Sequence, residues 1–156
     1  MEIKDRELHR IAITAIICRD GKYLITKRSP HKKAFPNKWT VPGGGLEVDD
    51  YINTPVSNEA GQWYYVLEKT LRREVKEEVN LEIGKPQYLL DLVFITPQGV
   101  PSIVLSYYAS YESGEVKLDE DATEYKWVTL GEAKNYDLIK GIWEELEMVE
   151  KILRKQ

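Results

Sequence analysis

The longest periodic pattern of apolar residues in this chain lies between residues 66 and 81. Leu67, Leu71, Val75 and Val79 recur at every fourth position, which is the spacing of one face of an α-helix. Most residues of this stretch favour helix, and neither Gly nor Pro interrupts it. The pattern therefore predicts an amphipathic helix that buries one face in the core.

Shorter apolar runs on both sides of this helix predict strands. Residues 11–18 are rich in β-branched side chains, and Asp20-Gly21 joins them to a second run at residues 23–27, which predicts a β-hairpin. No repeat or linker divides the chain, so we expect a single domain over residues 1–156. The remaining expected elements are strands at 88–96, 102–111 and 125–130, a helical turn at 131–135, and a terminal helix at 138–153.

Three acidic side chains, Glu74, Glu77 and Glu78, lie at the edge of the apolar stripe of the predicted helix. Carboxylates that crowd a buried face repel one another and are costly to desolvate without a partner. Arg73 pairs with Glu77 at this helical spacing, but one guanidinium does not balance three carboxylates. A hard divalent cation, Mg²⁺ or Mn²⁺, would balance them. A solvated acidic edge explains the spacing equally well, so the spacing alone leaves both interpretations open.

An apolar stretch upstream, which ends in a predicted Gly-rich turn at residues 43–45, favours the metal site over the solvated edge. Residues 39–47 read WTVPGGGLE and residues 73–81 read REVKEEVNL. Together they resemble the signature of the Nudix hydrolases, which is Gly, five residues, Glu, seven residues, and then Arg-Glu-U-x-Glu-Glu-x-Gly-U, where U is aliphatic. The second half matches at every specified position except Asn80, which replaces Gly. Asn tolerates the left-handed conformation expected just past a helix end, so we treat this departure as mild.

In its first half, this sequence departs further from the Nudix signature. Counting five residues from Gly44 reaches Asp50 in place of Glu, and 22 residues then separate Asp50 from Arg73, where the family has seven. The inserted segment of about 15 residues, 51–65, is rich in Asn, Pro, Ser and Gly, which predicts a loop. A short acidic side chain on a flexible loop is a poor anchor for a metal ion, because ordering the loop costs backbone entropy. We therefore expect Asp50 to be dispensable and Asp50→Ala to change the catalytic rate less than about tenfold.

The resemblance implies an α/β fold of the Nudix type, an α/β/α sandwich with a mixed sheet. It also implies metal-dependent hydrolysis of a nucleoside diphosphate linked to a further group. In such an enzyme Glu74, Glu77 and Glu78, with the backbone carbonyl of Gly43, would hold Mg²⁺, or Mn²⁺ in its place. One of the glutamates, or an acid of the 119–124 loop, would take the proton from water, and Arg73 would orient the glutamates. A chain this short is most similar to the nucleoside triphosphatases of the family, which release a monophosphate and pyrophosphate.

Three other functions stay open. A nucleotide-sugar or dinucleotide pyrophosphatase would use the same site on a larger substrate. A non-catalytic nucleotide-sensing domain is disfavoured, because a sensor does not need all three acids. An isoprenoid diphosphate isomerase of the same fold would need a Cys near the metal, whereas Cys18 lies in an apolar run typical of a buried structural thiol.

The amino-acid composition limits the classes of partner that this protein could bind. The net charge of −4 is spread over mixed charges, which argues against binding to bulk nucleic acid and leaves a small nucleotide as the expected partner. The single cysteine excludes an internal disulfide, and the apolar runs are too short to span a bilayer. The charged segment 1–10 does not resemble a secretory signal. We therefore expect a cytoplasmic protein that does not bind membranes.

Two further groups of residues are candidates for substrate or metal contacts. Basic residues cluster between Lys27 and Lys38, and Arg28, at a strand end, is the best candidate for a phosphate contact. The acidic loop contains Glu120, Asp121 and Glu124, which are further candidates for metal ligands or a base; the alternative is a solvated loop.

Aromatic residues lie at the carboxyl end of the inserted segment 51–65. Trp63 and Tyr64, followed by Tyr65, would stack on a base, lie in a homodimer interface, or only attach the insertion to the helix.

Overall fold

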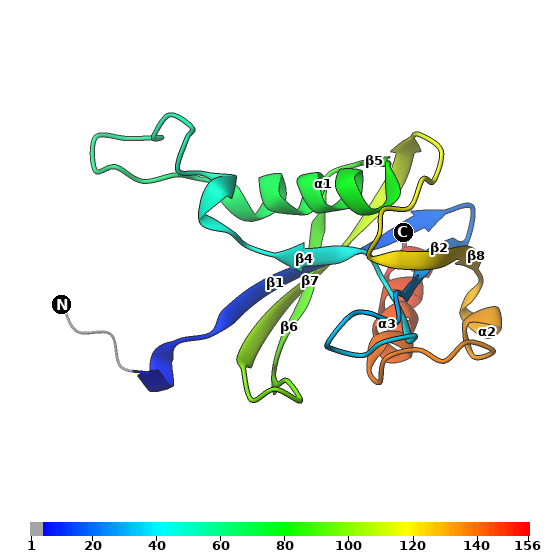
Figure 1. The fold of residues 1–156 in the computed structure, drawn as a ribbon. Coiled ribbons are helices and arrows are strands. Elements are labelled where there is room, and N and C mark those ends of the chain that lie inside the picture. The colour runs from blue at the N-terminus through cyan, green and yellow to red at the C-terminus, as the bar shows by residue number, and fades with distance from the viewer. Residues whose placement is uncertain (1–4) are drawn as a thin grey trace.

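The computed structural model describes residues 5–156 and consists of a mixed β-sheet between helices (Figure 1). The helices are α1 (Val66–Val79), α2 (Leu130–Ala133) and α3 (Ile142–Arg154), with 3-10 turns at Asp5–Glu7 and Val48–Asp50. The strands are β1 (Arg10–Arg19), β2 (Lys22–Arg28), β3 (Trp39–Thr40), β4 (Gly43–Gly45), β5 (Glu82–Ile83), β6 (Gln87–Ile95), β7 (Pro101–Ser113) and β8 (Ala122–Val128).

The sheet is organised around β1 and β7, which run parallel with residues 10–18 beside residues 102–110. The other strand pairs are antiparallel: β1 with β2 and β4, β2 with β3 and β8, and β7 with β5 and β6. β2 and β4 both pair with the same edge of β1 but at different ends, so the sheet divides there. This mixed sheet confirms the expected class.

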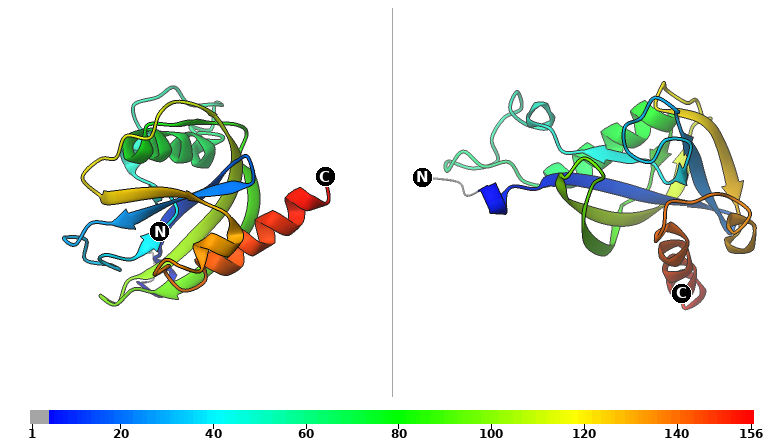
Figure 2. Two further views of the ribbon diagram at one scale, coloured as in Figure 1. Left: turned by 90° about the vertical axis from the view of Figure 1, so that its right-hand side faces the viewer. Right: turned by 60° about the horizontal axis from the view of Figure 1, so that its bottom comes forward.

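Alternation of side chains along β1 creates two cores, one on each face of the sheet. Ile13, Ala15 and Ile17 pack against Leu71 and Val75 of α1. On the opposite face, Ile16 packs in a second cluster that contains Leu146 and Val149 of α3 together with Ala133 of α2. Figures 1 and 2 show α1 above the sheet and α3 below it, which confirms the α/β/α sandwich.

Two local signals in the sequence form as predicted. Asp20 and Gly21 both have positive φ, 49° and 76°, as a tight turn between two twisted strands requires. Asn80 ends α1 in the left-handed conformation with φ 60°, and its backbone N–H donates to the carbonyl of Lys76. The replacement of Gly by Asn in the signature is therefore accommodated at a normal helix end.

Two predicted boundaries were wrong for reasons that lie outside the local sequence. The stretch Gly43–Gly45 is not a turn but strand β4, because β1 offers it a free edge for pairing. The terminal helix begins at Ile142 rather than Leu138, because Leu138 forms a β-bridge with Trp39 and Gly141 has φ 99°. Among residues 5–156, no helix is long and apolar enough to cross a membrane.

Candidate active site

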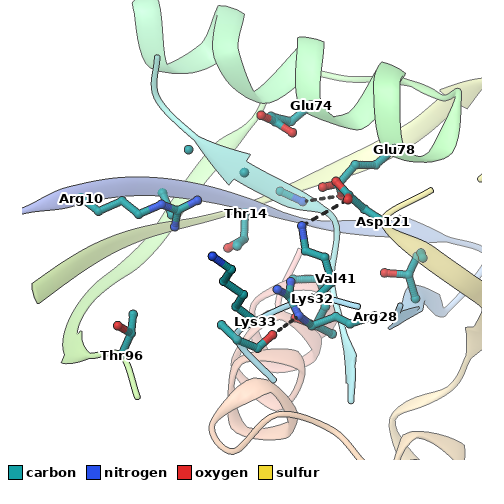
Figure 3. Close-up of a pocket in the computed structure, with 18 of the residues that line it drawn as sticks. Arg10, Thr14, Arg28, Lys32, Lys33, Val41, Glu74, Glu78, Thr96 and Asp121 are labelled. Atoms are coloured by element: carbon teal, nitrogen blue, oxygen red, sulfur yellow. Dashed lines mark hydrogen bonds and ion pairs between the residues drawn. The ribbon is translucent and has the colours of Figure 1, made fainter. Parts of the chain in front are cut away.

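A cleft of about 530 Å³ opens where β2 and β4 diverge from β1. One wall is acidic and contains Glu74 and Glu78 of α1 together with Asp121. The facing wall is basic, and Figure 3 shows Arg28, Lys32 and Lys33 on the side opposite the two glutamates. The glycines of β4 line the cleft beside the acidic wall, and the hairpin between β6 and β7 contributes Thr96, Gln98 and Val100.

Glu78 is the most perturbed acid of the cleft. Burial raises the pKa of its carboxyl from an ordinary 4.5 to about 8, and the nearby charges of Glu74, Asp119 and Asp121 add to the rise. A hydrogen bond from the backbone N–H of Gly43, at 3.1 Å, opposes the rise without cancelling it. Glu78 therefore lies where negative charge is concentrated and poorly solvated.

Glu74 lies directly over the glycine strand. Glu74 is 9% exposed, and burial raises the pKa of its carboxyl despite an ion pair with Arg73 at 3.0 Å. A Cβ added to Gly44 would overlap the Glu74 carboxylate, so glycine at this position is what allows the carboxylate to lie where it does. The position of Glu74 thus depends on the glycine signature as well as on α1.

Arg73 connects the acids of α1 with Asp50. Its guanidinium donates two hydrogen bonds to the Asp50 carboxylate, at 2.5 and 3.1 Å, and pairs with Glu74 and Glu77 at 3.0 Å. Arg73 does not line the cleft, which fits the expectation that it orients the glutamates. The Asp50 hydrogen bond raises the pKa of Arg73 above its ordinary value.

The prediction that Asp50 lies on a flexible loop was wrong. Its side chain is 4% exposed, and it accepts a hydrogen bond from the backbone N–H of Glu47 within the 3-10 turn Val48–Asp50. Burial acts to raise the pKa of Asp50, but hydrogen bonds from Arg73 and Glu47 outweigh it and lower the pKa below 3.8. The insertion begins only after Asp50, so its length does not move this residue away from α1.

Glu77 lies at the outer edge of the site. Its side chain is 57% exposed, and it contacts Arg73 rather than the cleft. The three glutamates of the signature therefore differ in setting, since Glu74 and Glu78 line the cleft and Glu77 faces solvent.

The acidic loop places only some of its candidates at the cleft. Asp121 lines the cleft and pairs with Lys32 at 3.2 Å, close to Glu78 in Figure 3. Glu124 pairs instead with Lys27 at 3.4 Å, and Glu120 is not part of the lining, although its backbone carbonyl accepts a hydrogen bond from Ser29. Asp119, one of the acids of the 119–124 loop named as candidates for the base, lies near enough to raise the pKa of Glu78.

The basic wall contains the predicted Arg28 and one residue that the sequence did not indicate. Arg28 is held by a hydrogen bond from its Nε to the carbonyl of Ala34 at 2.9 Å, and burial lowers its pKa. Arg10, at the start of β1, also lines the cleft. It is far in sequence from the basic cluster, and only the pairing of β1 with β4 brings it to the site.

The aromatic residues of the insertion are not brought to the cleft. Residues 51–65 project beyond the amino end of α1 (Figures 1 and 2). Trp63 packs on Tyr51 with ring centroids 5.1 Å apart and donates its indole N–H to the carbonyl of Thr54. Tyr64 accepts a hydrogen bond from Asn58 and is 55% exposed. Neither side chain lines the cleft, so their predicted contact with substrate receives no support from this arrangement.

The donor set of the acidic wall fits a hard divalent cation. Its side-chain donors are carboxylate oxygens, and Glu74, Asp119 and Asp121 add to the rise in the pKa of Glu78, a crowding of acids that a bound cation would relieve. Among residues 5–156, no three acidic, His or Cys side chains already converge as a preformed cage. Gly43 contributes its N–H to Glu78 here, which does not test the predicted role of its carbonyl as a ligand.

Comparison with known proteins shows the family of this chain. The NUDIX domain family matches residues 8–150, which is nearly the whole chain and includes both halves of the signature. The chain belongs to the Nudix family. A nucleoside triphosphatase NudI from Klebsiella pneumoniae (strain 342) is 27% identical over 139 residues, covering 83% of this chain and 88% of that protein. NudI from Escherichia coli (strain K12) is 27% identical over 146 residues, with the same shares covered.

Solved structures share the Nudix fold. The MutT protein from Methanosarcina mazei Go1 aligns with a TM-score of 0.70 at 22% identity, covering 93% of this chain and 95% of that one. The NUDIX domain of Shewanella oneidensis NrtR, solved with ADP ribose, aligns with a TM-score of 0.72 at 18% identity, covering 97% and 94%. The family and the fold confirm the expected enzyme class, a Nudix pyrophosphohydrolase.

Proposed function

We propose that this Nudix protein hydrolyses a nucleoside triphosphate to a nucleoside monophosphate and pyrophosphate, with Mg²⁺ or Mn²⁺ as its cofactor. The observation that carries the proposal is the opposition of two charged walls in one cleft. The basic wall suits the triphosphate, and the acidic wall suits the cation that a triphosphate requires. The similarity to two proteins named nucleoside triphosphatase supports the choice of substrate.

The acids of the site would hold the metal. Glu74 and Glu78 are the principal proposed ligands because they line the cleft, and Asp121 faces the same space. Glu77 and the Gly43 carbonyl remain proposed ligands, as does Glu120, with less support because its side chain is not part of the lining. When bound, the cation supplies charge neutralisation for the phosphates and makes a water molecule more acidic.

The remaining polar residues position the substrate and move the proton. Arg28, Lys32 and Lys33 bind phosphate oxygens, and Arg28 is the most constrained of them because Ala34 holds its guanidinium. An acid of the inner wall, Glu78 or Asp121, accepts the proton of the attacking water. Arg73 keeps Glu74 and Glu77 in place and does not contact substrate.

Two alternative functions use the same site. A nucleotide-sugar or dinucleotide pyrophosphatase would bind a longer substrate in the same cleft of about 530 Å³. A nucleotide sensor would bind without turnover. The isomerase alternative loses support because Cys18 does not line the cleft and burial raises the pKa of its thiol to about 12.

A substrate panel tests the proposal directly. Ribo- and deoxyribonucleoside triphosphates, a nucleotide sugar and a dinucleoside polyphosphate are each incubated with Mg²⁺ or Mn²⁺, and pyrophosphate and phosphate are measured separately. We expect pyrophosphate release from triphosphates, lost in Glu78→Gln. Faster cleavage of the sugar or dinucleotide would favour the first alternative, and tight binding without any product would favour the sensor.

The cellular setting and the assembly are part of the same proposal. A small-molecule nucleotide as partner, a cytoplasmic location and a homodimer built through residues 51–65 are each consistent with the chain. Fractionation of cells that express the protein and light scattering of the purified protein test the last two.

A further inference from the structure

Arg10 is a cationic side chain that lines the cleft and has no role in the proposed reaction so far. It begins β1 and is exposed. Arg72, Arg73 and Arg154 each pair with an acid. Within the described residues 5–156, by contrast, no acid pairs with Arg10, and no carbonyl accepts a hydrogen bond from its guanidinium. The N–H groups of this guanidinium are therefore available to a ligand in the cleft.

The alternation of side chains along β1 turns Arg10 toward the cleft. Arg10, Ala12 and Thr14 lie two residues apart, so they share one face of the strand, and all three line the cleft. The next residue of this series, Ile16, belongs to the apolar core. Figure 3 shows Arg10 at the end of the cleft away from Asp121, with its guanidinium directed inward. We call this the outer end of the cleft.

The guanidinium of Arg10 lies over the glycine strand β4. Ala12 is the partner of Gly45 in the pairing of β1 with β4. A Cβ added to Gly45 would lie 3.1 Å from Nη2 of Arg10 and 3.5 Å from its Cζ, so a side chain there would crowd the guanidinium. The preceding glycine, Gly44, is the one against the Glu74 carboxylate. The glycine strand therefore places the cation of Arg10 beside the acidic wall.

Arg28 is the second guanidinium of the cleft, and it is half-buried where Arg10 is exposed. Burial lowers the pKa of Arg28, the charges of Glu78 and Asp121 act to raise it, and the charge of Arg10 acts to lower it. Two cations that face the same space repel each other, and an anion that lies between them relieves this repulsion. The two guanidinium groups therefore suit an anion that extends from the inner part of the cleft to its outer end.

The lining of the cleft indicates which part of a nucleotide lies at each end. Around Arg10 it consists of the glycines of β4 and small side chains of β1, which offer no apolar surface to a base but allow a phosphate to come close to the backbone. Around Arg28 it includes Ala34, whose carbonyl binds the guanidinium, and Ala122, which pairs with Arg28 in the sheet. The nucleoside therefore fits the inner end, and the phosphate chain extends toward Arg10.

We propose that Arg10 binds the terminal phosphate of a nucleoside triphosphate and so selects triphosphates over diphosphates. A diphosphate bound between Arg28 and the acidic wall stops short of the outer end, whereas a third phosphate extends the anion to the Arg10 guanidinium, which is suited to paired hydrogen bonds with phosphate oxygens. The inference rests on the proposed function in one respect, because it takes a nucleotide as the ligand of the cleft.

Binding of nucleotides that cannot be cleaved between the α and β phosphates tests this selection. The probes are the α,β-imido triphosphates and diphosphates of the four common ribonucleosides, titrated calorimetrically with Mg²⁺. The measured quantity is the ratio of the dissociation constants of diphosphate and triphosphate for the nucleoside that binds most tightly. In the parent this ratio should be about tenfold or more, the effect of a hydrogen bond between charged groups.

Three variants assign the preference to Arg10. Arg10→Gln should weaken the triphosphate about tenfold and the diphosphate less than about twofold, because only the triphosphate loses a contact. Arg10→Lys keeps the charge without the paired donors and should give an intermediate ratio. Arg6→Gln is the matched control, since it removes the same charge from the exposed turn before β1, and Arg6 does not line the cleft. This control should keep the parent ratio.

Four results would overturn the inference. These are a parent without a preference for triphosphate, an Arg10→Gln protein that keeps the preference, an Arg10→Gln protein that loses the same affinity for both nucleotides, and an Arg6→Gln protein that behaves like Arg10→Gln. Thermal unfolding checks that each variant is folded.

The outcome for the proposed function is separate. If the analogues bind with the expected ratios but triphosphates are not hydrolysed, the proposed function fails and this inference stands. If the parent releases pyrophosphate from triphosphates but Arg10→Gln keeps the parent ratio, the inference fails and the proposed function stands. A parent that binds none of the triphosphates contradicts both.

Discussion

Replacing Glu78 by Gln should stabilise the metal-free protein at alkaline pH while reducing its turnover by orders of magnitude. Gln has the shape of the neutral acid and keeps an oxygen that accepts the hydrogen bond from the Gly43 N–H. The substitution therefore removes the buried charge and little else. Loss of turnover is expected because the site loses a carboxylate that faces the cleft.

The magnitude follows from the raised pKa of Glu78. Between an ordinary 4.5 and about 8 the folded protein holds a proton that the unfolded chain has released. The contribution of this group to the free energy of unfolding is therefore fully present below pH 4.5 and is lost as the pH rises to about 8. At about 1.4 kcal/mol for each pH unit, the loss reaches at most about 5 kcal/mol. The Glu78→Gln variant does not titrate at this position, so its advantage over the parent grows over this range.

Urea unfolding in EDTA at several pH values between 5 and 9 measures this difference. Glu77→Gln is the matched control, because Glu77 is 57% exposed and its replacement should change the pH dependence of stability little while still reducing turnover. Adding Mg²⁺ should stabilise the parent at high pH and the Glu78→Gln variant much less, since the metal binds the folded site. A difference between Glu78→Gln and parent that stays constant with pH, or a variant that fails to fold, would refute the reasoning.

Three further predictions concern the surroundings of the site. Asp50→Ala should lower turnover more than about tenfold and reduce stability by about 2 kcal/mol, because it removes two hydrogen bonds to a charged partner; activity within tenfold of the parent would instead support the expectation from sequence. Gly44→Ala should reduce activity at least about tenfold by displacing Glu74, whereas Gly131→Ala, where a Cβ meets nothing within 4 Å, should have no such effect; equal activities in an assay of the two would contradict this. Deleting residues 52–62 should leave the fold intact and change either the mass in solution, by removing exposed Ile52 and Val56 from an interface, or the Michaelis constant. If light scattering and kinetics are both unchanged, these residues only pack on one another.

Much of this protein is determined by local sequence. The spacing of Leu67, Leu71, Val75 and Val79 predicts α1, because a helix face repeats every three to four residues whatever surrounds it. Asp20-Gly21 predicts the first hairpin for a similar reason, since few residues adopt two successive positive φ values. The glutamates of the proposed metal site lie on one such helix, but their spacing fits a solvated edge equally well, and only the resemblance to the Nudix signature favours a metal site.

Other features depend on partners that are distant in the chain. The stretch Gly43–Gly45 becomes a strand only because β1 has a free edge, and the start of α3 is delayed because Trp39 pairs with Leu138. Neither residue type nor spacing contains this information, since glycine has no local preference for a strand. The boundaries that sequence reasoning missed are those where the hydrogen bonds of the backbone are made across the fold.

The candidate active site likewise combines residues that local sequence predicts with residues that only the fold brings together. The acids of α1 follow from one helix, but Arg10 reaches the site only through the pairing of strands. Asp119 reaches it through a backbone hydrogen bond to Glu78, and Asp50 reaches Arg73 across 22 intervening residues. Sequence periodicity reports which face of an element is buried, whereas the partner of a buried polar group is chosen by which elements pack together. The tertiary structure alone decides that choice, because an ion pair or hydrogen bond requires two atoms within about 3 Å and not two residues at a fixed spacing.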